Sequence, residues 1–248
     1  MSGVLIVTGA SRGIGAACAR MGGRRGYAVC VNYLGSEDAA RSVVRDVEAG
    51  GGRALAVQAD VSRESEVVRL FEAVDRGLGR VTALINNAGI PLKAGKVVDC
   101  EETTLNRLWA VNVTSLFLCS REAVRRMSTA RGGAGGSIVN VSSAAARLGG
   151  GGSLVHYAAS KGAPDTFTKG LADEVATEGI RVNAVRPGII LTDIHAAMGI
   201  PERVEQLTKV VPMRRPGTAE ETAEAILWLL SPAASYVTAA NLDVAGGR

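Results

Sequence analysis

Histidine and cysteine are scarce in this 248-residue sequence, which has two of the first and four of the second. The cysteines are Cys18, Cys30, Cys100 and Cys119; none forms a Cys-x-x-Cys pair, and none lies near a histidine at metal-ligand spacing. A metal-binding function is therefore not indicated. We interpret the four cysteines as small apolar residues of a protein in a reducing compartment.

Long apolar runs and runs of like charge are also missing. No apolar stretch approaches the roughly 20 residues that span a bilayer, and the first ten residues lack the three regions of a signal peptide. The net charge is +4, but no block of five or six like charges suggests a nucleic-acid groove. We therefore expect a cytoplasmic protein with no membrane or nucleic-acid partner, whose mildly basic surface favours a phosphorylated cofactor.

The chain instead alternates short β-branched runs with longer stretches of helical spacing. Strands are expected at Val4–Val7, Ala28–Val31, Ala54–Val57, Ala83–Ile85, Ser137–Val141, Arg181–Val185 and Asn241–Val244. Helices are expected at Gly15–Arg25, Ser36–Ala49, Ser62–Leu78, Thr103–Ala130, Tyr157–Glu178 and Thr218–Leu230. This order predicts a doubly wound α/β Rossmann fold, with a seven-stranded, mostly parallel sheet covered by helices on both faces. We expect residues 1–248 to form one domain.

A glycine-rich turn follows the first expected strand and opens the first helix. Gly9, Gly13 and Gly15 are spaced Gly-x-x-x-Gly-x-Gly, which differs from the usual Gly-x-Gly-x-x-Gly of dinucleotide folds. Glycines here let the backbone approach a pyrophosphate, which then meets free N–H groups and the positive end of the helix. An ordinary strand-to-helix loop is the alternative, but the position directly after the first strand favours phosphate binding.

Tyr157 and Lys161 share one face of a helix because they are four residues apart. An ammonium beside a phenol favours the phenolate, so we expect Lys161 to lower the pKa of Tyr157 and make it an acid/base. Alone, the pair is better explained by an exposed tyrosine on an amphipathic helix, and only the other motifs favour the catalytic interpretation. Ser142 and Ser143 end the fifth strand, where open α/β sheets place ligands, and either hydroxyl could bind a substrate oxygen or merely cap the strand.

Taken together and in this order, these motifs resemble the short-chain dehydrogenase/reductase family over essentially the whole chain. The resemblance extends to Asp60-Val61, Asn86-Asn87-Ala88-Gly89, Asn112, Arg186-Pro187-Gly188 and the closing Asp243–Gly247. It implies an oxidoreductase that transfers a hydride between NAD(P)(H) and a carbonyl or alcohol carbon. The open alternatives are a ketone reductase, a sugar or polyol dehydrogenase, and a catalytically weak dinucleotide-binding sensor.

The resemblance also implies roles for individual residues. The implied catalytic residues are Asn112, Ser143, Tyr157 and Lys161, with Asn112 holding a water that supplies protons to Lys161. The cofactor-binding residues, implied by the resemblance or by the cofactor argument below, are Gly9, Ser11, Arg12, Gly13, Ile14, Gly15, Asn32, Asp60, Val61, Asn87, Ala88, Gly89, Tyr157, Lys161, Pro187, Gly188, Ile190 and Thr192. Asp60 would accept from the adenine amino group, and no metal is required.

Three departures from the family pattern bear on the site. Pro164 lies inside the expected Tyr157 helix, where an interior proline costs about 3 kcal/mol and puts the aim of Lys161 in question. The spacing from Ser143 to Tyr157 is one residue longer than the family pattern, and Gly149–Gly152 can absorb it. Ala239 replaces a usual glycine, which we interpret as a minor packing change.

NADP(H) is the expected cofactor, with NAD(H) as a second possibility. The second strand ends without the acidic residue that binds the ribose 2′-hydroxyl in NAD sites. Arg12 in the glycine turn can pair with a 2′-phosphate, and Asn32 and Ser36 can add neutral hydrogen bonds. Leu34 stands where some NADP-using relatives have a second basic residue.

Two further expectations concern assembly and the substrate loop. The helices at Thr103–Ala130 and Tyr157–Glu178 carry more apolar side chains than one sheet face needs, so we expect a homotetramer, or at least a dimer. These side chains include Leu116, Phe117, Leu118, Phe167 and Leu171. The mostly apolar segment Thr192–Val211 is expected to close over the substrate as a lid, in which His195 is either a substrate contact or solvated.

Overall fold

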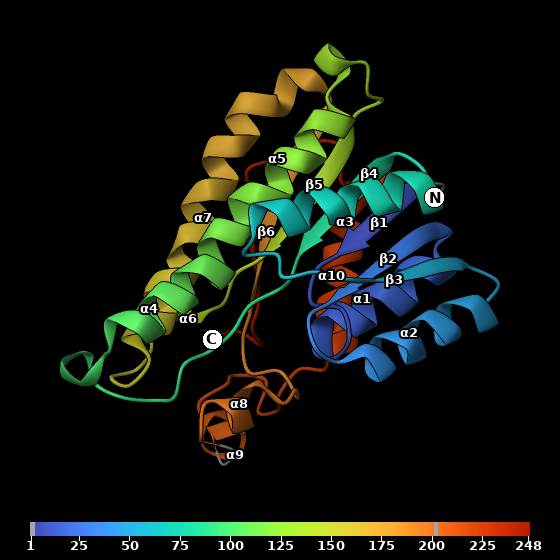
Figure 1. Ribbon diagram of the computed structural model, residues 1–248. Coiled ribbons are helices and arrows are strands. Elements are labelled where there is room, and N and C mark those ends of the chain that lie inside the picture. Colours follow the sequence, from blue (N-terminus) through green and yellow to red (C-terminus); the bar gives the residue numbers. More distant parts are fainter. Residues whose placement is uncertain (1–2, 201–202) are drawn as a thin grey trace.

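The computed structural model describes residues 3–200 and 203–248, and their side chains except those of His195, Ala196 and Arg203. A single seven-stranded sheet crosses the molecule in the order β3-β2-β1-β4-β5-β6-β7 (Figure 1). Its strands are β1 (Gly3–Val7), β2 (Tyr27–Tyr33), β3 (Arg53–Gln58), β4 (Val81–Asn86), β5 (Gly136–Val141), β6 (Ile180–Pro187) and β7 (Asn241–Val244). Every neighbouring pair is parallel, which confirms the doubly wound Rossmann fold.

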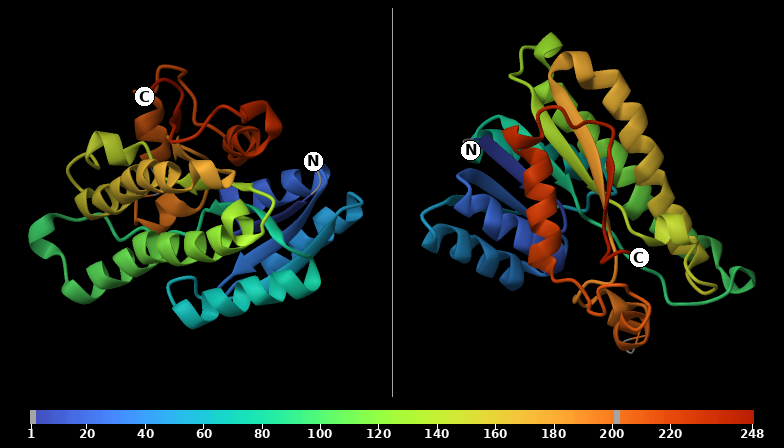
Figure 2. Two further views of the ribbon diagram at one scale, coloured as in Figure 1. Left: turned by 90° about the horizontal axis from the view of Figure 1, so that it is seen from above. Right: turned by 180° about the vertical axis from the view of Figure 1, so that it is seen from behind.

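Helices cover both faces of this sheet. The main helices are α1 (Gly13–Arg24), α2 (Glu37–Ala49), α3 (Glu64–Gly77), α4 (Glu102–Trp109), α5 (Ser115–Met127), α7 (Val155–Val175) and α10 (Ala219–Leu230). Short helices α6 (Ala145–Leu148), α8 (Ile194–Ala197) and α9 (Arg203–Thr208) lie in the connections. In Figure 2, α1, α2 and α10 lie on one side of the sheet, while α3, α5 and α7 cover the other.

The alternation of side chains along the strands divides the core into two layers. Leu5 and Val7 of β1 pack in the layer that holds α1, α2 and α10. Val4 and Ile6 of the same strand pack in the layer that holds α3, α5 and α7. Because both faces are covered, apolar residues form all of β1 and most of β4 and β5, as is usual for parallel sheets.

The long helix expected at Thr103–Ala130 is interrupted. A π-helical turn at Ala110–Thr114 separates α4 from α5, and a 3₁₀ turn follows at Thr129–Arg131. The π turn contains Asn112, whose amide bonds to residues outside the helix, and π turns often occur at functional sites. Local helical spacing does not reveal such a turn.

Pro164 does not end α7, which continues from Val155 to Val175. Proline has no N–H to donate to the carbonyl one turn earlier, so one hydrogen bond of the helix is missing. Neighbouring hydroxyl groups bond to helix carbonyls on either side of this missing bond. Ser142 Oγ donates to the Lys161 carbonyl at 2.8 Å, and Thr168 Oγ1 donates to the Pro164 carbonyl at 2.7 Å. The helix therefore tolerates Pro164, and Lys161 still points at the carboxyl end of β5, where Nζ donates to the Val141 carbonyl at 2.8 Å.

Two further departures from the family pattern have a backbone explanation. Gly149, Gly150, Gly151 and Gly152 all have positive φ, between 63° and 83°, so a side chain would be strained at each position. This run lies between α6 and α7, within the stretch from Ser143 to Tyr157 that is one residue longer than the family pattern. Ala239 has φ 60°, in the left-handed region that favours glycine, so its replacement of glycine strains the backbone and is more than a packing change.

The segment after β6 projects beyond the carboxyl edge of the sheet and contains α8 and α9 (Figures 1 and 2). Met198 of this segment is buried against Leu154 and Tyr157, so the segment packs on the start of α7. The side chain of His195 lies outside the described residues. Among the described residues, we find no helix long and apolar enough to cross a membrane.

Candidate active site

The glycine turn between β1 and α1 has the backbone that a phosphate cradle needs. Gly9 and Gly13 have φ of 61° and 56°, and a Cβ on Gly15 would lie 2.6 Å from the Gly9 carbonyl oxygen. Side chains are thus excluded at all three positions. The first N–H groups of α1 have no partner within the helix and point out of its N-terminus, so they can bind an anion.

Side chains from other strands hold this turn in place. Thr8 Oγ1 accepts from the N–H groups of Asn87 and Ala88, and Asn87 Nδ2 donates to the carbonyls of Thr8 and Gly9. Asn32 Oδ1 accepts from the Gly9 N–H at 3.2 Å, while Asn32 Nδ2 donates to the Val57 and Ala59 carbonyls. Asn32 and Asn87 therefore position the backbone of the cradle, and their amides are engaged by the protein itself.

A cavity of about 420 Å³ runs along the carboxyl ends of β1 to β4 beside this turn. It is lined by twelve of the expected cofactor residues and by Ser36; the twelve are Gly9, Ser11, Arg12, Gly13, Ile14, Asn32, Asp60, Val61, Asn87, Ala88, Gly89 and Thr192. Its size and its glycine cradle fit the adenosine and pyrophosphate parts of a dinucleotide.

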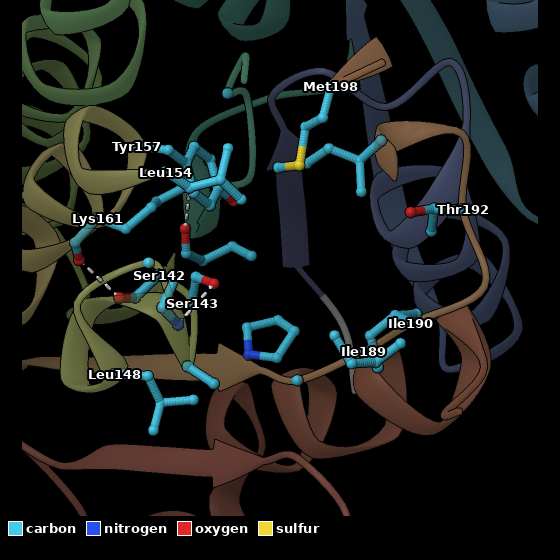
Figure 3. A pocket seen from close by; sticks show the side chains of 18 of the residues that line it. Ser142, Ser143, Leu148, Leu154, Tyr157, Lys161, Ile189, Ile190, Thr192 and Met198 are labelled. Atoms are coloured by element: carbon cyan, nitrogen blue, oxygen red, sulfur yellow. Dashed lines mark hydrogen bonds between the residues drawn. The ribbon is translucent and has the colours of Figure 1, made fainter. Parts of the chain in front are cut away.

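A second cavity, of about 280 Å³, adjoins the first and shares Ile14, Asn87, Gly89, Thr192 and Ile194 with it. Figure 3 shows its polar residues Ser142, Ser143, Tyr157 and Lys161 on one side, facing Ile189, Ile190 and Met198 on the other. Pro187 and Gly188 of the expected nicotinamide contacts also line it. The structure thus brings the expected catalytic serine, tyrosine and lysine to one cavity.

Ser143 and Tyr157 lie together although they come from different elements. Ser143 follows β5 and its Oγ accepts from the Ala145 N–H at 3.1 Å, which fixes the hydroxyl at the start of α6. Burial raises the pKa of Tyr157 to about 12, and a hydrogen bond with Ser143 opposes this rise only in part. The phenol is therefore protonated at neutral pH and can act as a proton donor.

The expectation that Lys161 lowers the pKa of Tyr157 is wrong for this structure. Burial lowers the pKa of Lys161 itself to about 8, with the nearby Asp165 carboxylate opposing the effect. The ammonium donates to the Val141 carbonyl, so its charge is directed at the end of β5. Loss of water around both side chains outweighs the attraction between an ammonium and a phenolate.

Asn112 connects the π turn to the active-site helix. Its Oδ1 accepts from the Ile90 N–H at 2.8 Å, and its Nδ2 donates to the Ile90 carbonyl and to Ser160 Oγ. A Cβ on Gly89 would lie 3.2 Å from Lys161 Nζ and 3.4 Å from Asn112 Oδ1, so the two groups converge beside this glycine. Asn112 therefore lies next to the lysine, but its amide is hydrogen-bonded to the Ile90 backbone and to the Ser160 hydroxyl.

Sequence reasoning missed several residues of the two cavities. Thr8 holds the glycine turn beside the larger cavity; it opens the glycine motif, but the partners that give it this role are distant in sequence. Arg107 lines the larger cavity and Arg248 lines the smaller one, but neither residue belongs to a recognised sequence motif. The apolar wall formed by Leu148, Leu154, Ile194 and Met198 comes from segments whose sequences show only general hydrophobicity.

Comparisons with known proteins agree with this site. Residues 9–248 match a family model described as Enoyl-(Acyl carrier protein) reductase. The chain is 51% identical over 245 residues to "Uncharacterized oxidoreductase YgfF" of Escherichia coli (strain K12), with 99% of each chain covered. It is 37% identical over 253 residues to a 3-oxoacyl-[acyl-carrier-protein] reductase of Synechocystis, covering 98% of this chain and 96% of the relative.

A solved structure has the same fold. The blue fluorescent protein from a metagenomic library, in complex with NADPH, superposes with a TM-score of 0.90 at 35% identity, covering 99% of this chain and 97% of that one. The family model and the relatives each span nearly the whole chain. The chain therefore belongs to the short-chain dehydrogenase/reductase family and is a nicotinamide-dependent oxidoreductase.

Proposed function

We propose that the protein reduces ketones that carry apolar substituents, and oxidises the matching secondary alcohols, with Tyr157 as the general acid/base. The observation that carries this proposal is the largely apolar lining of the smaller cavity in Figure 3, where Ile189, Ile190 and Met198 lie opposite Ser143 and Tyr157. Leu148 and Leu154 add apolar surface beside these two hydroxyls, and Thr192 is a polar residue on the opposite side. A sugar or polyol needs polar partners around its whole surface, because each buried hydroxyl without one costs free energy. The apolar wall therefore favours a ketone reductase over a sugar dehydrogenase.

The polar side of the cavity can polarise a carbonyl group. The bound nicotinamide cofactor supplies the hydride. Ser143 and Tyr157 donate hydrogen bonds to the substrate oxygen, and these bonds strengthen as negative charge develops there. Tyr157 then gives its proton to that oxygen. Because the pKa of Tyr157 is raised to about 12, the phenol holds its proton until the substrate oxygen becomes more basic.

Lys161 and Asn112 take part in the reprotonation of Tyr157 after it has given its proton to the substrate. A small cavity of about 10 Å³, lined by Asn112, Lys161, Val141 and Asn140 among others, has room for about one water molecule. We assign this cavity to the water expected beside Asn112. In this proposal the amide of Asn112 fixes the wall of the cavity, and the Lys161 ammonium passes the proton onward.

The larger cavity would hold the adenosine and pyrophosphate parts of the cofactor, over the N-terminus of α1. Gly9, Gly13 and Gly15 admit the pyrophosphate, and Asp60 and Val61 bind the adenine. Tyr157 and Lys161 also hold the nicotinamide ribose, and Pro187, Gly188, Ile190 and Thr192 contact the nicotinamide end. Asn32 acts by holding Gly9 rather than by direct contact, because its amide is already engaged.

NADP(H) is the proposed preferred cofactor, because β2 ends without an acidic residue and Arg12 lines the larger cavity. Arg12 Nη1 lies 3.8 Å from Asp193 Oδ2, and both side chains are largely exposed, so this pair is weak and the guanidinium is available to a 2′-phosphate. The related structure in complex with NADPH supports the same choice.

The ratio of kcat/KM for NADPH and NADH tests this preference. We expect Arg12→Ala to lower the ratio and Asp193→Asn to raise it, since the aspartate competes for the same guanidinium. Arg24→Ala, an exposed arginine at the opposite end of α1, is the matched control. A wild-type preference for NADH, or an unchanged ratio in Arg12→Ala, contradicts the proposal.

We also propose a cytoplasmic homotetramer. The four cysteines are free thiols, which fits a reducing compartment. Of the apolar side chains that suggested assembly, Leu116, Leu118 and Leu171 pack in the core. Phe117 is 54% exposed and contacts Phe167 edge-on, with ring centroids 4.5 Å apart. This pair joins α5 to α7 on the outer surface and supports a helix-to-helix interface there.

Tyr157→Phe tests the catalytic assignment. The variant keeps the ring and loses the hydroxyl, so we expect turnover of an accepted ketone to fall at least about 100-fold while cofactor binding is retained. Turnover is followed by NADPH absorbance and binding by titration calorimetry. Near-normal turnover in this variant contradicts the role of Tyr157.

A further inference from the structure

Arg107 lies across the larger cavity from the glycine turn and reaches the residue expected to bind adenine. Its Nη1 donates to Asp60 Oδ2 at 3.1 Å and to Ser62 Oγ at 2.8 Å. Arg107 comes from α4, whereas Asp60 and Ser62 follow β3, so the contact joins two walls of the same cavity. Arg107 is 44% exposed at its side chain, and Asp60 is 13% exposed.

The hydrogen bonds of Asp60 leave little freedom to its carboxylate. Oδ1 accepts from the Ser62 N–H at 3.0 Å and from the Ser62 hydroxyl at 2.6 Å. Oδ2 accepts from Arg107, and the Asp60 N–H donates to Glu66 Oε2 at 2.7 Å. A carboxylate has about four acceptor positions, so three are filled and one remains on Oδ2. Because Asp60 lines the larger cavity, this position can accept from a donor bound there.

The charge of Asp60 is stabilised by the same contacts. Burial acts to raise the pKa of this carboxyl, but the hydrogen bonds from Ser62 and the charge and hydrogen bond of Arg107 outweigh it, so the pKa is lowered. Asp60 is therefore ionised at neutral pH and accepts hydrogen bonds without donating any. An exocyclic amino group is the complementary partner for the remaining acceptor position.

We propose that Arg107 is a positioning residue for adenine recognition: it holds Asp60 Oδ2 so that one acceptor faces the amino group of the base. The inference rests on the proposed cofactor function and adds to it a residue that no motif identifies. The two N–H groups of Nη1 are used by Asp60 and Ser62, so this end of the guanidinium acts through the carboxylate. Without Arg107, the carboxylate can turn toward solvent, and the bond to the amino group weakens.

The test compares two cofactors that differ only at the base. NADPH has the 6-amino group, and its hypoxanthine analogue has a 6-oxo group that cannot donate. We expect Arg107→Ala to raise Kd for NADPH about fivefold and to leave Kd for the analogue nearly unchanged. Binding is measured by titration calorimetry on the full chain, and thermal unfolding confirms that the variant is folded.

Arg63→Ala is the matched control. Arg63 Nε lies 3.9 Å from the same Asp60 Oδ2, beyond hydrogen-bond distance, and its side chain is 71% exposed. This variant removes a positive charge near Asp60 without removing a hydrogen bond, so both Kd values should match the wild type.

Three outcomes overturn the inference. The first is an unchanged Kd for NADPH in Arg107→Ala, and the second is an equal loss for NADPH and its analogue, which indicates a general change in the cavity. The third is a loss in Arg63→Ala as large as in Arg107→Ala, which indicates charge alone. If the wild type binds neither NADPH nor NADH, the proposed cofactor function fails instead, so the two failures are distinguishable.

Discussion

The reductive activity should fall as pH rises above about 8, because Lys161 loses its charge there. Burial lowers the pKa of Lys161 to about 8, against the opposing effect of Asp165. Below this pH the lysine is an ammonium that can return a proton to Tyr157, and above it the lysine is neutral. Tyr157, with a pKa of about 12, stays protonated through the same range, so the decline reports Lys161.

The size of the decline follows from the ionisation of one group. One pH unit above its pKa, about a tenth of Lys161 remains charged, so kcat for ketone reduction should be about tenfold below its plateau. Two units above, the loss should approach about 100-fold. The assay is NADPH absorbance at saturating cofactor and ketone, from pH 6 to pH 10 in buffers of constant ionic strength.

Two variants separate Lys161 from other titrating groups. Arginine stays charged to above about pH 12, so Lys161→Arg should have a flat profile over this range at whatever residual rate it retains. Asp165→Asn removes a carboxylate that raises the pKa of Lys161, so its decline should begin at lower pH. A wild-type kcat that is constant to pH 9.5, or a decline that persists in Lys161→Arg, would refute this reasoning.

Three further predictions concern stability and assembly. Asn32→Ala removes the buried amide that bonds to Gly9, Val57 and Ala59, so urea unfolding should show a free energy of unfolding lower by about 1–3 kcal/mol. An unchanged unfolding midpoint contradicts the role of Asn32. Ala239 has a left-handed backbone that costs about 1–2 kcal/mol for alanine, and Ala239→Gly removes this strain. Glycine adds an entropic cost of roughly 0.5–1 kcal/mol, so we expect a small net increase in the free energy of unfolding. A lower stability would show that φ of 60° is not strained at that position. Light scattering at micromolar concentration should show a tetramer that Phe117→Glu weakens, and a monomeric wild type would contradict the proposed assembly.

Much of the fold was predictable because its signals are local. The strand and helix alternation placed all seven strands, with bounds that differ from the structure by up to two residues, and the glycine turn was placed at the start of α1. Glycine spacing depends on the backbone conformation of a few consecutive residues, and Gly9 and Gly13 do have positive φ. The Tyr157 and Lys161 pair shares α7 because helical spacing is also a local property.

The electrostatics of the site were not predictable in the same way. Spacing alone led us to expect that Lys161 would lower the pKa of Tyr157. The structure shows the opposite direction, because the pKa depends on how much water the fold removes from both groups. The burial of Tyr157 depends on residues from separate segments, including Leu154 and Met198, so no short motif could predict it.

By itself, the sequence determined the family, the parallel α/β architecture and the identity of the chemical groups, since each depends on short runs of residues. Only the tertiary structure decided which groups touch. Arg107 and Asp60 are separated by 47 residues, and Thr8 and Ala88 by 80, yet each pair is hydrogen-bonded at the carboxyl edge of the sheet. Parallel strands bring their carboxyl ends to one edge whatever their order in the chain, so contacts there depend on sheet order and packing rather than on sequence spacing.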